Sequence, residues 1–137
     1  MRYVCLMVAL LSSACATTTP QLFPVEYVVV DNPEARRIEI AYSNDKDRPV
    51  CLPQGGWPTS SGAMDQASGY LELLVGGQRY PISEVNTGYC FEDCDLKVLP
   101  GETVRSSIPY EQFGLPVNRH LEEKQLVFQP VAYTCSR

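Results

Sequence analysis

Apolar side chains recur at every second position along much of this chain, and that period limits what it can fold into. Residues 37–42 alternate strictly, with Ile38, Ile40 and Tyr42 on one face and polar or small residues on the other. Residues 70–75 show the same period. A period of two belongs to a β-strand with one buried face, and no segment keeps a helical period over three turns. The sequence therefore predicts an all-β fold.

Turn-forming residues divide the chain into short segments. Between two of the apolar runs stands Gly76-Gly77, and two successive glycines permit the positive φ values of a two-residue hairpin turn. We expect about seven or eight short strands arranged as an antiparallel β-sandwich. The expected strands are residues 25–30, 37–42, 50–52, 70–75, 78–82, 96–99, 103–108 and 125–135.

Two further expectations concern the second half of the chain. Residues 96–99 and 103–108 flank the turn signal Pro100-Gly101, so we expect them to pair with each other. Residues 109–115 are expected to hold one helical turn, and the polar segment 116–124 to be a loop.

Pro130 interrupts the last expected strand. Because proline cannot donate a hydrogen bond to a sheet, this position should be an edge or a bulge. The inward face is then expected to pass from Leu126 and Phe128 to Val131 and Tyr133. An exposed strand edge near Pro130 is a candidate docking site in a larger assembly.

The amino terminus has the three parts of an export signal. Arg2 supplies a positive charge, residues 3–11 form a short apolar run, and residues 12–16 are small. A run of this length cannot cross a membrane, which needs about 20 residues. We therefore expect the protein to be exported.

Two cleavage sites compete at the end of this signal. Residues 11–15, Leu-Ser-Ser-Ala-Cys, resemble the lipobox of bacterial lipoproteins, although Ser12 stands where that family usually has an aliphatic residue. The resemblance implies cleavage before Cys15, lipid on Cys15 and sorting to the outer membrane, on the side facing the periplasm. The alternative is ordinary signal peptidase cleavage after Ala14-Cys15-Ala16, which would release a soluble periplasmic or secreted protein from Thr17.

We prefer the lipoprotein interpretation, which divides the chain into three parts. Residues 1–14 are then the signal peptide, residues 15–24 a tether and residues 25–137 the β-sandwich domain.

Four cysteines remain in the expected domain: Cys51, Cys90, Cys94 and Cys135. An even number in an exported domain indicates two disulfides, and four cysteines allow three pairings. We prefer Cys90–Cys94, which closes a small acidic loop, together with Cys51–Cys135, which ties the last strand to the middle of the sheet. Zinc would need two close cysteine pairs or added histidines, and the sequence has one close pair.

The order of turns and strands resembles the immunoglobulin-like domains of many bacterial envelope proteins. The resemblance covers most of residues 25–135 and includes the segments Leu99-Pro100-Gly101-Glu102-Thr103-Val104 and Phe128-Gln129-Pro130-Val131-Ala132-Tyr133. It implies an immunoglobulin-like sandwich. Immunoglobulin domains proper place a tryptophan between two bridging cysteines. This sequence departs from that pattern, because its Trp57 lies in a loop.

Acidic residues outnumber basic ones, 16 against 11, which gives a formal charge of −5 and a pI near 4.8. Such a chain lacks the basic surface that phosphate binding needs, so we expect no nucleic-acid partner.

Residues for a catalytic centre are scarce. His120 is the sole histidine, and its polar neighbours in residues 116–123 indicate a solvated loop. No G-x-S-x-G motif marks a nucleophile. We expect no catalytic residues, no metal and no cofactor.

Two loops are candidate recognition sites. One is the cysteine-bounded loop with Phe91, Glu92, Asp93 and Asp95, whose expected disulfide would lower the entropy lost on binding. The other contains Trp57, which either covers the core or is an exposed anchor; we prefer burial.

These observations predict a non-enzymatic periplasmic or outer-membrane lipoprotein that acts as a binding or structural module of the cell envelope. Its expected partners are the membrane, through the lipid anchor, and an envelope protein. One alternative is a secreted inhibitor of a peptidase or lysozyme, which would present one of the two loops. A second alternative is a small hydrolase that uses His120.

Overall fold

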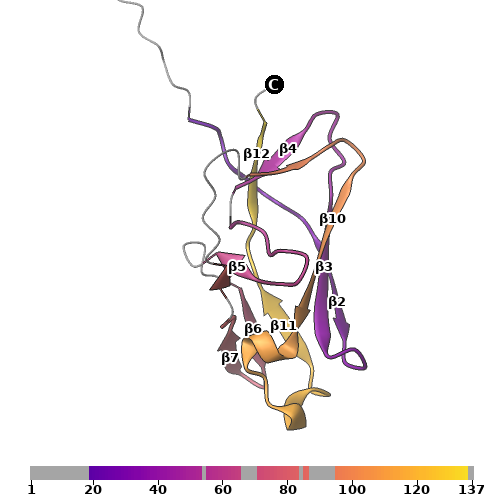
Figure 1. The fold of residues 1–137 in the computed structure, drawn as a ribbon, viewed down its shortest axis with the longest axis vertical. Helices are drawn as coiled ribbons and strands as arrows, with labels where there is room; N and C mark the ends of the chain where they lie inside the picture. The colour runs from indigo at the N-terminus through magenta and orange to yellow at the C-terminus, as the bar shows by residue number, and fades with distance from the viewer. Residues whose placement is uncertain (1–18, 54, 66–70, 84, 87–94, 136–137) are drawn as a thin grey trace, which may run out of the picture.

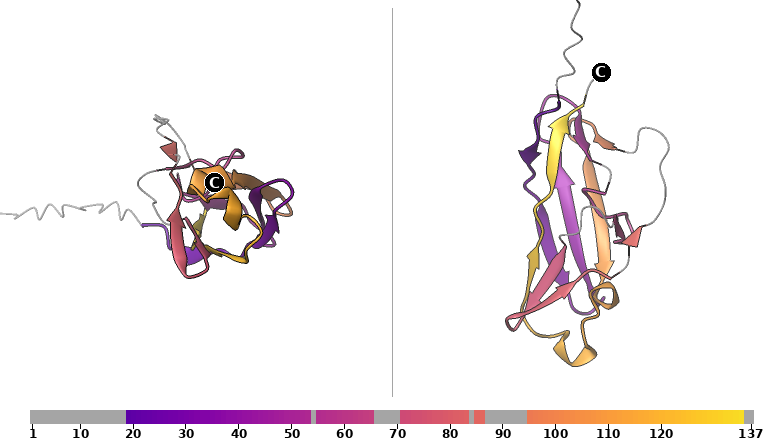
Figure 2. Two further views of the ribbon diagram at one scale, coloured as in Figure 1. Left: turned by 90° about the horizontal axis from the view of Figure 1, so that it is seen from below. Right: turned by 90° about the vertical axis from the view of Figure 1, so that its left-hand side faces the viewer.

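The protein is all-β in this computed structural model, which describes residues 19–53, 55–65, 71–83, 85–86 and 95–135 (Figure 1). Ten strands form three antiparallel sheets. Figures 1 and 2 show an elongated molecule in which β3, β10 and β12 run roughly along the long axis. Within the described part of the chain, no helix is long and apolar enough to span a membrane.

The sheets combine strands that are distant in sequence. The first has the order β1-β12-β4-β9, with β1 at Phe23–Pro24, β12 at Val131–Thr134, β4 at Val50–Leu52 and β9 at Leu96–Val98. The second has the order β10-β3-β2, with β10 at Thr103–Pro109, β3 at Arg37–Ser43 and β2 at Val28–Asn32. The third has the order β11-β6-β7, with β11 at Lys124–Val127, β6 at Glu72–Val75 and β7 at Gln78–Pro81.

Smaller elements complete the fold. A short parallel pair joins β5 at Met64–Asp65 to β8 at Val85–Asn86. Two 3₁₀ helices follow β10: η1 at Tyr110–Phe113 and η2 at Val117–Arg119. The first confirms the helical turn predicted for residues 109–115, and the second lies within the segment expected to be a loop.

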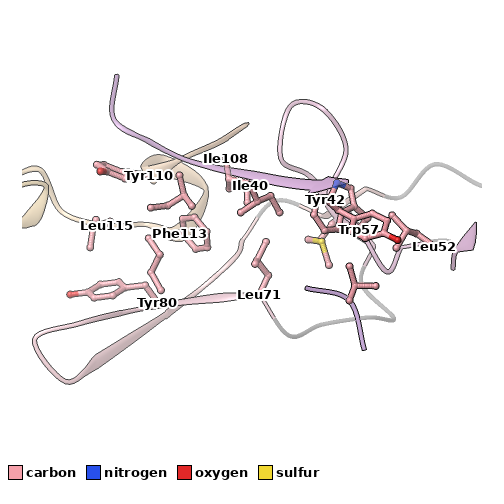
Figure 3. Packing of buried hydrophobic residues seen from close by; sticks show 14 of the residues in the cluster. Ile40, Tyr42, Leu52, Trp57, Leu71, Tyr80, Ile108, Tyr110, Phe113 and Leu115 are labelled. Carbon is pink, nitrogen blue, oxygen red and sulfur yellow. The ribbon is translucent and has the colours of Figure 1, made fainter. Parts of the chain in front are cut away.

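The predicted alternation of buried side chains is confirmed in β3 and around β6. Ile38, Ile40 and Tyr42 are buried on one face of β3. Leu73 and Val75 are fully buried. These side chains meet in one core, which Figure 3 shows extending from Trp57 at one end to Tyr80 and Tyr110 at the other.

Two extended runs of chain each change sheet, which is why the antiparallel sheets have ten strands where seven or eight were expected. The first run passes from β1 to β2, and the last passes from β11 to β12. They meet where they cross, since the Val25 amide donates a 3.0 Å hydrogen bond to the Pro130 carbonyl. Pro130 itself is buried there, but β11, which ends three residues earlier, lies at the edge of its sheet, so a docking edge near Pro130 stays a prediction.

The inward face after Pro130 also differs from the expectation. Ala132 is fully buried, whereas Val131 and Tyr133 are only partly buried. Leu126 and Phe128 pack against the core and Pro130 is buried, so even-numbered positions face inward through the crossing and the expected shift of the inward face does not occur.

The strands β9 and β10 do not pair with each other, which corrects the prediction for residues 96–99 and 103–108. Instead β9 pairs with β4 and β10 pairs with β3. The turn between them therefore connects two sheets. Its geometry is fixed by the Glu102 carboxylate, which accepts a 2.8 Å hydrogen bond from the Leu99 amide.

Asn44 joins this turn to the end of β3. It is 1% exposed, and its side-chain amide donates 2.9 Å hydrogen bonds to the carbonyls of Arg48 and Val98. Its backbone amide donates to the Glu102 carbonyl, and its carbonyl accepts from the Gly101 amide. One buried residue thus satisfies backbone groups from two separate turns.

The disulfide Cys51–Cys135 is present, as predicted. It links residues 84 apart in sequence, with 5.2 Å between their Cα atoms. β4 and β12 are the two inner strands of their sheet and are paired directly. The predicted Cys90–Cys94 bridge and the lipidation site Cys15 lie outside the described residues.

The hairpin between β6 and β7 turns at Gly76 and Gly77, with φ values of 53° and 81°. This confirms the predicted positive-φ turn. Arg119 approaches the turn and donates a 3.0 Å hydrogen bond to the Val75 carbonyl. It also donates to Glu122 and to the Tyr80 hydroxyl, so its guanidinium is held in place.

Replacing Gly76 with alanine is expected to destabilise the protein more than replacing Gly77. A Cβ atom at Gly76 would lie 2.3 Å from Arg119 Nη2, whereas a Cβ at Gly77 meets nothing within 4 Å. We expect losses of about 2 to 3 kcal/mol for Gly76→Ala and about 1 kcal/mol for Gly77→Ala, measured by urea unfolding.

The backbone alone predicts the opposite order for these two variants. The φ of 53° at Gly76 is near the left-handed region open to other residues, and the 81° at Gly77 is further from it. A larger loss at Gly77 would therefore show that Arg119 moves away at little cost.

Candidate interaction surface

Strand β2 is an edge strand whose apolar side chains are exposed. It pairs with β3 on one side and ends the sheet on the other. Its residues Val28, Val29 and Val30 are 64%, 41% and 50% exposed. Exposed edges in natural proteins often carry lysine, proline, a bulge or an inward-pointing charge that discourages pairing, and of these β2 contains only the inward-pointing Asp31.

The opposite edge of the same sheet is covered. The Ser107 amide of β10 donates a 3.2 Å hydrogen bond to the Ser60 carbonyl. Gly62 lies so close to this strand that a Cβ there would be 2.8 Å from Ile108 Cα. The loop of residues 58–63 thus protects β10, and among the described residues nothing pairs with the outer edge of β2.

The outer face of this sheet is hollow beside the valines. Register places Val28 next to Ala41 and Ala41 next to Arg105, so these side chains form one row across three strands. A groove of about 330 Å³ is lined by this row, by Val30 and by polar residues that include Arg37 and Glu39. A second groove of about 710 Å³ shares the same row and extends toward Phe23. The small side chain of Ala41 leaves the space between the valines and Arg105.

The two arginines on this face differ in their contacts with the described residues. Arg37 donates a 3.3 Å hydrogen bond to the Ser107 hydroxyl and lies 3.8 Å from Glu39. Arg105 is exposed and makes no ion pair or side-chain hydrogen bond with any residue that the structure describes. Beside the groove this face therefore presents the guanidinium of Arg105, which no described residue pairs.

The other face of β2 is held firmly against the rest of the molecule. The Lys124 side chain is 1% exposed, and its ammonium lies 3.1 Å from Asp31 Oδ2. It also donates to the carbonyls of His120 and Glu122. The Tyr110 hydroxyl donates to the same Asp31 carboxylate. Burial, reinforced by this hydrogen bond, raises the pKa of Tyr110 above its usual range.

A second contact fixes the start of β2. The Tyr27 hydroxyl donates a 2.8 Å hydrogen bond to the Phe128 carbonyl, and the two rings lie 5.4 Å apart. Burial raises the pKa of Tyr27. The strand is therefore anchored from beneath at both ends, and its open edge is preorganised for pairing.

His120 is buried, so the prediction of a solvated histidine is wrong. It is 7% exposed, and its ring and that of Tyr110 form a T-shaped pair with 4.9 Å between their centroids. Its Nε2 lies 3.1 Å from the Leu115 carbonyl, which can only accept, so this nitrogen carries the proton. The polar neighbours in sequence point outward while η2 turns the imidazole inward.

Trp57 is 6% exposed, as the burial interpretation predicted. Its ring packs against those of Tyr27, Tyr42 and Phe128, with centroid distances of 6.2, 6.4 and 5.8 Å, respectively. Its indole Nε1 is buried and finds no hydrogen-bond partner among the described residues. The ring is part of the core, as Figure 3 shows.

The other candidate recognition loop is only partly described. Phe91, Glu92 and Asp93 lie outside the described residues. Asp95 is partly buried and accepts a hydrogen bond from the Tyr133 hydroxyl. Its carboxylate thus takes part in a contact with β12.

The open edge of β2 was not identified from the sequence, although a signal was present. Residues 25–30 were predicted as a strand from their β-branched and aromatic content, but Val28, Val29 and Val30 do not alternate with polar residues. An antiparallel strand with one solvated face normally alternates. Three successive valines therefore indicated a strand with apolar groups on both faces.

No protein-family model matches this sequence, and no curated protein matches it significantly.

Proposed function

We propose that this protein is an exported, non-enzymatic module of the cell envelope that holds a partner protein at the open edge of β2. The observation that carries the proposal is the exposure of Val28, Val29 and Val30 on an edge strand whose outer side pairs with no described residue. Pairing with an added strand would bury these valines and satisfy the edge amides and carbonyls.

Export is supported by two independent features. The amino-terminal sequence has the charge, apolar run and small residues of a signal peptide. The disulfide Cys51–Cys135 is of a kind that persists in oxidising compartments. Lipid attachment at Cys15 would place the domain close to the outer membrane, facing the periplasm.

The architecture we propose is an immunoglobulin-like sandwich. It is supported by the antiparallel sheets and by a shared core, in which Ile40 and Ile108 of one sheet meet Leu73 of another. Both termini of the described chain lie at one end of the long axis, and η2 lies at the other (Figure 2). A lipid anchor would thus leave the β2 edge accessible along the side of the molecule.

Placing lysine at both Val28 and Val30 is expected to release the partner. Charged side chains on an edge discourage strand pairing, and both positions are exposed, so the fold itself should be unaffected. The matched control places lysine at Val117 and Leu121, which are 71% and 89% exposed on η2 and the turn after it. The measurement is sedimentation velocity of each chain, extracted from envelopes of the native host in mild detergent.

We expect the wild-type chain and the control to sediment as a complex and the edge variant to sediment as a single chain. Equal sedimentation of all three would contradict the proposal. The intact mass of the same extracted chains shows whether they begin at a lipidated Cys15 or at Thr17.

A further inference from the structure

We propose that the segment held at β2 belongs to another protein, adds an extended strand to this edge and places a glutamate opposite Val28, within reach of Arg105. This inference rests on the function proposed above and specifies the chemistry of the partner. It follows from the register of the sheet, from the charge of Arg105, which no described residue pairs, and from the sequence of β2 itself.

The geometry of a β-sheet fixes which side chains of an added strand lie on the outer face. Its side chains alternate, so every second one lies beside Val28 and Val30. Those two valines line the groove of about 330 Å³ together with Ala41 and Arg105. A side chain that enters the groove therefore contacts valine on one side and approaches the guanidinium on the other.

The row Arg105–Ala41–Val28 selects the charge of the occupant. Arg105 has no ion-pair partner among the described residues, whereas Arg37, which lines the same groove, is engaged by Glu39 and Ser107. A carboxylate is the side chain that complements an unpaired guanidinium. Ala41 is too small to separate the two groups.

Distance favours glutamate over aspartate. An added strand would lie three strand spacings from β10, or about 14 Å. Extended arginine and glutamate side chains together just span this separation, with the glutamate stem packed over Val28. An aspartate, one methylene shorter, would leave the charges further apart.

A second copy whose β2 pairs about any of the three valines does not supply that carboxylate. In an antiparallel pairing of two β2 strands centred on Val28, Val29 or Val30, the residue opposite Val28 is Val28, Val30 or Asn32, respectively. None of the three is acidic.

The test uses two nine-residue peptides with the full mature protein. In both peptides valine and threonine alternate, Val-Thr-Val-Thr-Xaa-Thr-Val-Thr-Val, and Xaa is glutamate in one and glutamine in the other. Binding is measured by fluorescence anisotropy to the wild type, to Arg105→Gln and to the control Arg48→Gln, which removes a charge from the β3–β4 turn.

We expect the glutamate peptide to bind about three- to fivefold more tightly than the glutamine peptide to the wild type and to Arg48→Gln. The two peptides should bind Arg105→Gln equally. The V28K/V30K variant should bind neither.

Other outcomes overturn this inference in distinguishable ways. Equal binding of both peptides to the wild type, lost in V28K/V30K, would leave the edge function standing and remove the role of Arg105. A concentration-dependent dimer of the wild type, lost in V28K/V30K, would show that the occupant is a second copy. Absence of peptide binding and of dimers, together with no complex in the envelope extract, would contradict the edge function itself.

Discussion

Replacing Cys51 and Cys135 together with alanine is expected to lower the free energy of unfolding by about 4 to 5 kcal/mol. The bridge joins residues 84 apart, so its loss releases a long loop in the unfolded chain. The two strands it connects are already paired, which means the native geometry should persist without the bond. Urea unfolding of the double variant and the wild type, both under oxidising conditions, measures the difference.

Substitution isolates this bridge better than reduction does, because a reductant would also act on any bond between the other cysteines. The single variant Cys51→Ala serves as a control for the free thiol. A loss below about 1 kcal/mol in the double variant would show that the unfolded chain stays compact without the bridge.

Asn44→Asp is expected to cost about 3 kcal/mol or more at neutral pH. The substitution removes two donated hydrogen bonds and turns a buried carboxylate toward the carbonyls of Arg48 and Val98. Asn44→Ala should cost about 2 kcal/mol, since it leaves the carbonyls unpaired without adding a charge. Both losses are measured by thermal and urea unfolding.

The matched control is Asn118→Asp. Asn118 is exposed on η2, and its substitution makes the same change in charge as Asn44→Asp. Its effect should stay within about 0.5 kcal/mol. If Asn44→Asp were as mild as the control, the turn would have rearranged to admit water, and Asn44 would not be the residue that joins the two turns.

Local patterns predicted most of the strands because burial imposes them directly. The alternation at Ile38, Ile40 and Tyr42 and the glycines at the β6–β7 turn depend only on neighbouring residues, and the structure confirms them. The pairing of Cys51 with Cys135 was also predicted, because two close and two distant cysteines favour that arrangement.

Sheet assignment could not be predicted because it depends on contacts between distant segments. The turn after β9 has the same sequence signals whether its flanking strands pair or diverge. In this structure the two strands diverge, and the Val98 carbonyl at the end of β9 accepts a hydrogen bond from the buried side chain of Asn44, more than fifty residues earlier. The burial of His120 likewise depends on Tyr110 and Leu115, which bring partners to a residue whose own neighbours are polar.

The candidate surface was predicted least well, for a related reason. A strand is recognised by its composition, but whether it lies inside or at the edge of a sheet is decided by the rest of the chain. The sequence of β2 fits a strand with apolar groups on both faces, and only the topology shows that its outer side lacks a neighbour among the described residues.

Sedimentation of the V28K/V30K variant extracted from native envelopes tests the central claim most directly. We expect this variant to sediment as a single chain while the wild type and the V117K/L121K control remain in a complex. The mass of the released component should differ from that of this chain. A complex that survives in the edge variant would contradict the claim that β2 holds the partner.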